Sequence, residues 1–96
     1  MNARVNIDGA IISEEPVIVL GQKPHMLASV MLSDSNGEHE GVSLHIKIVG
    51  DMVDLEPLKL RMVAGREVRL RGRLVGKNSY FLACWARHVR TKEKMA

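Results

Sequence analysis

The strongest constraint on the fold is an alternation of apolar and polar residues that recurs in five separate stretches of the chain. In residues 68–76, VRLRGRLVG, apolar or glycine positions alternate with Arg69, Arg71 and Arg73. A period of two is typical of a β-strand with one face buried and the other exposed. The chain is therefore expected to be mostly β-structure. The predicted strands cover residues 3–12, 25–34, 42–50, 66–76 and 80–89.

The segments between these strands contain turn signals and one helix. SEEP, residues 13–16, breaks the first alternation, and the run VIVLGQKP that follows ends in a turn. Asn36-Gly37 indicates a hairpin between the second and third strands. Residues before the fourth strand lose the alternation, which predicts a short helix from about Glu56 to Ala64. Pro57 is then expected in its first turn, where a missing N–H is tolerated.

Three strands, a helix and two further strands form the order of the five-stranded Greek-key barrel called the OB-fold. The alternative is a β-sandwich, which generally needs more strands. Ninety-six residues make one domain, assigned to residues 1–90, with a polar tail at 91–96. The chain has only three aromatic residues, so its core is expected to be aliphatic.

The two halves of the chain carry opposite charge. Residues 1–56 hold three basic and nine acidic residues, whereas residues 57–96 hold eleven basic and two acidic residues. Such an asymmetry favours a basic surface that recruits nucleic acid. The alternative is a dipolar protein whose halves neutralise each other in the fold.

The sequence predicts a cytoplasmic protein that does not enter a membrane. No run approaches the ~18 apolar residues of a membrane span. The single cysteine, Cys84, allows no disulfide within the chain and suits a reducing compartment.

No catalytic, metal or cofactor site is predicted. The four histidines and Cys84 lack the spacing of metal ligands. Cys84 falls on the inward phase of the last strand, where an inert core thiol is expected. There is no glycine-rich phosphate loop, because Gly72 and Gly76 belong to a strand and its turn. The protein is therefore not expected to be an enzyme.

The last two strands, taken as a hairpin, place a candidate nucleic-acid surface on their outer face. The inward set would be Val68, Leu70, Gly72 and Leu74 with Leu82, Cys84 and Ala86. Cations on such a face can follow the phosphates of a single strand while aromatic rings stack on its bases. The predicted site residues are Arg69, Arg71, Arg73, Lys77, Phe81, Trp85 and Arg87.

Each part of this surface has another interpretation. The arginines can simply keep an exposed strand soluble. Trp85 can lie in a subunit interface, where aromatic residues concentrate. Phe81 can belong to the core if its strand carries a bulge.

Several segments resemble the bacterial single-stranded DNA-binding proteins and the related primosomal replication protein N. VNIDGAIISEEP is similar to the opening strand of that family and the loop after it. Gly72-Arg73-Leu74 resembles the hallmark of its fourth strand, and YFLACWARHV resembles its fifth. The resemblance implies an OB-fold, a homodimer or homotetramer, and replication proteins as further partners.

The chain also departs from that family. It has fewer aromatic residues, and it ends in basic RTKEKMA rather than an acidic tail. These departures favour a minimal accessory protein of the primosomal or mobile-element type.

The predicted function is sequence-independent binding of single-stranded DNA, without catalysis, in replication, recombination, or plasmid or phage maintenance. The alternative is an OB-fold protein-interaction module of a replication or restart complex that binds nucleic acid weakly or not at all. RNA is a further candidate ligand.

Overall fold

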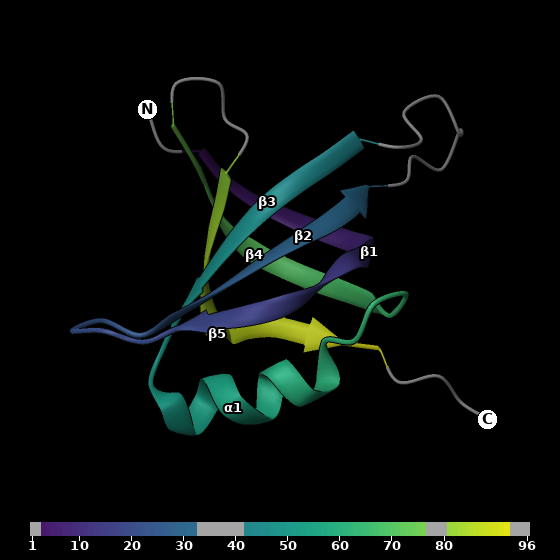
Figure 1. Cartoon of the computed structure of the whole chain (residues 1–96). Helices are drawn as coiled ribbons and strands as arrows, with labels where there is room; N and C mark the ends of the chain where they lie inside the picture. The colour runs from purple at the N-terminus through teal and green to yellow at the C-terminus, as the bar shows by residue number, and fades with distance from the viewer. Residues whose placement is uncertain (1–2, 33–41, 77–80, 93–96) are drawn as a thin grey trace.

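A computed structural model of the protein describes residues 3–32, 42–76 and 81–92 (Figure 1). Five strands close into a barrel in the order β1-β2-β3-β5-β4, with β4 pairing back to β1. The β3–β5 pair is parallel and the other pairs are antiparallel. One helix lies between β3 and β4, so the predicted OB-fold-like barrel is confirmed. The elements are β1 (Ala3–Val19), β2 (His25–Leu32), β3 (Val42–Val49), α1 (Met52–Arg61), β4 (Glu67–Val75) and β5 (Phe81–Thr91).

The first strand is longer than its alternation predicts. β1 runs through SEEP instead of ending before it. The β1–β2 register shifts between Ile12 and Glu14 and again between Glu14 and Val17. These bulges hold the extra residues, and Pro16 lies in the second of them, where the ladder does not need its missing N–H. SEEP therefore bends the strand rather than breaking it.

Gly9 allows β1 to pair with two neighbouring strands of the barrel. It has a φ of 83°, a left-handed conformation that favours glycine. The β1–β4 register shifts between Ile7 and Ala10, around this residue. β1 pairs with β4 up to Ile11 and with β2 from Ile11 onward. The bend at Gly9 thus helps to close the sheet.

The helix prediction is wrong at both ends, because α1 also ends at Arg61, three residues before Ala64. α1 begins at Met52, four residues before Glu56, so Pro57 lies inside the helix and not in its first turn. Pro57 is exposed, which lets water bond the carbonyl that its missing N–H leaves free. Leu55 and Leu58 are fully buried. Burying two leucines contributes about 1.5–3 kcal/mol each, enough to offset a proline cost of about 3 kcal/mol.

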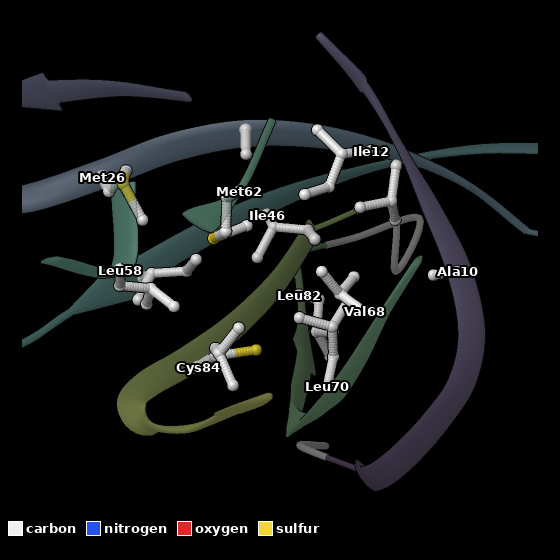
Figure 2. Close-up of a cluster of buried hydrophobic side chains, with 14 of the residues drawn as sticks. Ala10, Ile12, Met26, Ile46, Leu58, Met62, Val68, Leu70, Leu82 and Cys84 are labelled. Carbon is white, nitrogen blue, oxygen red and sulfur yellow. The ribbon is translucent and has the colours of Figure 1, made fainter. Parts of the chain in front are cut away.

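The core is a single aliphatic cluster, as predicted (Figure 2). Every second residue of β2 and β3 packs into it: Ala28, Val30, Leu44, Ile46 and Ile48 are buried, and Leu32 is partly buried. α1 adds Leu55 and Leu58, and Met62 follows directly after it. The largest buried side chains are Ile12, Met26, Val30, Ile46, Ile48, Leu55, Leu58, Met62, Val68, Leu70, Leu82 and Cys84.

Some predicted features fall outside the described residues, namely the Asn36-Gly37 hairpin and Lys77. Within the described part of the chain, no helix has the length and hydropathy needed to cross a membrane.

Candidate nucleic-acid interface

The three arginines of β4 lie on the outside of the barrel. Arg69, Arg71 and Arg73 are exposed, whereas Val68 and Leu70, which alternate with them, are fully buried. In a strand, side chains two residues apart share a face and lie roughly 7 Å apart. The alternation in the sequence therefore corresponds to a row of cations on one face of β4.

A large bulge in β5 opens beside this row. Leu70 pairs with Val89 and Gly72 pairs with Cys84, so Arg71 alone stands opposite residues 85–88 of β5. The strand changes direction at this point (Figure 1). Ala86 remains buried, but Trp85, Arg87 and His88 are exposed. The bulge thus presents three polar or aromatic side chains next to Arg71.

Gly72 is required for this close approach of the two strands. A β-carbon at this position would collide with the backbone carbonyl oxygen of Ala83 and lie 2.9 Å from Sγ of Cys84. Real contacts of a β-carbon are longer than this. Only glycine therefore lets β4 lie against β5 where the bulge begins.

Two arginines outside the predicted site join the row. Arg4 of β1 lies opposite Arg73 in the β1–β4 ladder, and Arg90 of β5 lies opposite Arg69. Both are exposed. Arg4 could have been found from the sequence, because it alternates with Val5 and an OB barrel pairs its first and fourth strands.

These residues surround two adjoining depressions. The first, which we call the arginine–tryptophan groove, has a volume of about 580 Å³. It is lined by Arg4, Val49, Arg71, Gly72, Arg73, Val75, Ala83, Cys84, Trp85 and His88. Arg71 and His88 also line the second depression, together with Asn6, Arg69, Leu70, Arg87 and Arg90. The two form one basic surface over β1, β4 and β5.

Two acidic side chains among the described residues engage arginines of this surface. Oδ2 of Asp8 accepts a hydrogen bond from Arg69 at 3.2 Å, and Oδ2 of Asp54 lies 3.7 Å from Nε of Arg87. The guanidinium of Arg69 holds the pKa of Asp8 below its usual value through this hydrogen bond and its charge. Among the described residues, no ion pair involves Arg71 or Arg73. Within the described ranges, Arg71 and Arg73 of the arginine–tryptophan groove therefore have no acidic partner that competes with an anion.

Trp85 forms the boundary between that groove and a third depression. Its side chain is 62% exposed, which is unusual for tryptophan in a monomer. On its other side it faces the β1–β2 turn and the start of α1. This depression is lined by Gln22, Lys23, Pro24, Val49, Gly50, Asp51, Asp54, Trp85, Ala86, Arg87 and His88.

Phe81 lies away from the arginines. It pairs with Val75 of β4 and His45 of β3, and the rings of Phe81 and His45 have centroids 6.3 Å apart. Phe81 is half-buried and lines a depression with Glu14, Glu15 and Val17 of β1. The structure therefore brings together Arg69, Arg71, Arg73, Trp85 and Arg87, but not Phe81, and Lys77 is outside the described residues.

Cys84 contributes a buried thiol to the lining of the groove. Burial raises the pKa of the Cys84 thiol to about 12, so this thiol remains protonated at neutral pH. In residues 3–32, 42–76 and 81–92, no group of three histidine, cysteine or acidic side chains could hold a metal ion. The surface contains cationic side chains, hydrogen-bond donors and one exposed indole ring.

No family model, no curated protein and no solved structure matches the chain.

Proposed function

We propose that the protein binds single-stranded nucleic acid, with single-stranded DNA as its ligand, and does so without sequence preference. The observation that carries this proposal is the placement of one exposed indole among arginines from three strands. Arginines can follow a phosphate backbone, and Trp85 can stack on any base because every base has a π-face. Neither contact reads a base edge, so neither distinguishes one sequence from another.

Arg71 lies where the two basic depressions meet. Arg71 lines both basic depressions, and Trp85 lines the first of them. A strand that crosses both would contact Arg71 near the middle of its path. A base stacked on Trp85 would lie beside that contact.

We also propose where in the cell, and in which processes, the protein acts. A binder of this kind would cover single strands in the cytoplasm during replication, recombination, or plasmid or phage maintenance. It would hand these strands to replication proteins. The resemblance to single-stranded DNA-binding proteins and primosomal replication protein N supports this setting, through Gly72-Arg73-Leu74 and the residues of β5.

The test is a titration of the protein with oligo(dT), followed by the fluorescence of Trp85 at several salt concentrations. We expect quenching and an affinity that falls steeply as salt rises. Arg71→Ala should reduce the slope of log K against log salt by about 0.7 to 1, because one phosphate contact is lost. Arg66→Ala is the matched control, since Arg66 is an arginine outside β4 and α1 that lines none of the three depressions described above.

Two results would overturn the proposal. One is the absence of binding at about 50 mM salt, where electrostatic affinity is high. The other is an equal salt slope for Arg71→Ala and Arg66→Ala. Either result would favour the protein-interaction module, with Trp85 contacting a partner. Oligo(U) titrated in parallel shows whether RNA binds as well.

A further inference from the structure

Helix α1 has a second apolar face that points away from the barrel. Leu55 and Leu58 are buried in the core, but Val53 is 77% exposed and Leu60 is 79% exposed. With about 100° between successive residues, Val53, Pro57 and Leu60 lie within about 60° of one another around the helix axis. This direction is roughly opposite to that of the buried leucines. We call these three residues the outer stripe.

Charged side chains flank the outer stripe in a regular order. On helical geometry, Asp54 and Arg61 lie along one side of it, and Glu56 and Lys59 lie along the other. Each side is acidic toward the N-terminus of the helix and basic toward its C-terminus. A surface with this pattern is complementary to itself when one copy is reversed.

We propose that the outer stripe binds the outer stripe of a second copy of this chain, with the two α1 helices antiparallel. The two-fold axis of such a pair is perpendicular to both helices. Each flank of one helix therefore lies beside the same flank of the other helix, which runs in the opposite direction. Asp54 then faces Arg61 of the second copy, and Glu56 faces Lys59 of the second copy. A parallel pair would instead bring like charges together.

One position of the axis satisfies both kinds of ion pair. The midpoint between residues 54 and 61 is also the midpoint between residues 56 and 59, and it lies between Pro57 and Leu58. Oδ2 of Asp54 is near Arg87 of its own chain, which leaves Oδ1 to accept from Arg61 of the second copy. Four ion pairs can therefore surround the apolar contact at once.

The size of the helix determines the strength of this dimer. Ten residues span about 15 Å, so the contact is far smaller than the ~1,600 Å² of a standard stable interface. The dimer is therefore weak and forms as the protein concentration rises. Its contact lies on α1, which leaves Trp85 outside the subunit interface.

The first experiment is sedimentation equilibrium of the full chain over a wide range of concentrations. The mean mass should rise from 10.7 kDa toward twice that value. Leu60→Glu should raise the dissociation constant at least about tenfold, because two carboxylates would enter the apolar contact. Leu20→Glu is the matched control, since Leu20 is 74% exposed but lies outside α1, and it should dimerise like the wild type.

The second experiment exchanges charges between two copies. Glu56→Lys places lysine opposite Lys59 of the second copy, and Lys59→Glu places glutamate opposite Glu56 of the second copy. Each variant alone should dimerise at least about tenfold more weakly than the wild type. An equimolar mixture should recover the wild-type mass, because the mixed pair restores opposite charges at all of these positions. Mixing does not alter the sequence of either variant. The recovery can therefore come only from contacts between the two copies, and not from interactions within one helix.

The proposal is overturned by a wild type that remains at 10.7 kDa at every concentration. It is equally overturned by a dimer that survives Leu60→Glu, which would place the interface elsewhere. Failure of the mixed variants to associate would exclude the antiparallel arrangement. None of these results depends on whether the protein binds nucleic acid.

Discussion

At the scale of single residues, the basic surface contains arginines in different electrostatic situations. Arg69 donates to Asp8 at 3.2 Å and Arg87 lies near Asp54, but Arg71 and Arg73 take part in no ion pair within the described ranges. An approaching phosphate must compete with Asp8 for Arg69. Asp8 is therefore an internal competitor of the proposed ligand, and removing its charge frees one arginine.

Asp8→Asn should tighten the binding of oligo(dT), because Arg69 loses its competitor and the surface loses a negative charge. The gain should stay below about tenfold, since exposed ion pairs are weak. Glu15→Gln is the control for loss of one carboxylate, because Glu15 is exposed on β1 beside Phe81, away from the arginines. Equal affinity of the two variants for oligo(dT), measured by Trp85 fluorescence, would show that Asp8 does not compete with the ligand for Arg69.

The same ion pair determines a pH dependence. The pKa of Asp8 is lowered in the folded protein, so the pair stabilises the fold at pH values above the ordinary carboxyl pKa. This contribution is lost as the pH falls through the lowered pKa of the folded state. An NMR titration of Arg69→Ala should show the pKa of Asp8 returning toward its ordinary value.

At the scale of secondary-structure elements, the candidate site depends on the bulge in β5. Two regular strands would place residues 85–88 in a flat ladder opposite β4. Instead the register shifts between Leu70 and Gly72, and Trp85 and His88 are exposed beside Arg71. Gly72 makes this shift possible, because it removes the side chain where Ala83 and Cys84 approach.

Gly72→Ala should destabilise the protein by about 1–3 kcal/mol or more, as overpacking against a neighbouring backbone does. It should also change the fluorescence of Trp85, which follows Cys84 directly. The control is Gly21→Ala, since a β-carbon at Gly21 meets no atom within 4 Å. Urea unfolding of both variants measures the loss of stability. Equal unfolding midpoints for Gly72→Ala and Gly21→Ala would contradict the requirement for glycine at position 72.

At the scale of the whole molecule, closure of the barrel assembles the basic surface from distant parts of the chain. Arg4 of β1 reaches Arg73 of β4 only because the first and fourth strands pair. Trp85 reaches the same groove through the β5 bulge. A ligand that contacts β1, β4 and β5 together binds the folded state alone, so it must stabilise the entire barrel.

Oligo(dT) at about a hundred times its dissociation constant should therefore add about 2.7 kcal/mol to the free energy of unfolding. For a domain of this size the melting temperature should rise by about 10 °C or more. Differential scanning calorimetry with and without the oligonucleotide measures this shift, and high salt should abolish it. An unchanged melting temperature, where fluorescence shows full binding, would mean that the ligand contacts an unfolded segment.

The sequence by itself determined the order of the elements and the outward direction of Arg69, Arg71 and Arg73. Alternation has a period of two, and this local property reports which face of a strand is buried. The aliphatic core and the buried positions of Leu82, Cys84 and Ala86 follow from the same rule.

Only the tertiary structure decided where these elements begin, bend and meet. SEEP remains within β1 because bulges hold its extra residues, and α1 begins at Met52 because burial of Leu55 outweighs the cost of Pro57. Arg4 and Arg90 join the basic surface through pairings between strands that are distant in the sequence. Phe81 and Trp85 share a phase in the alternation, yet the β5 bulge places only Trp85 in the groove. Local alternation cannot encode such pairings, because they depend on how the closed barrel brings distant strands together.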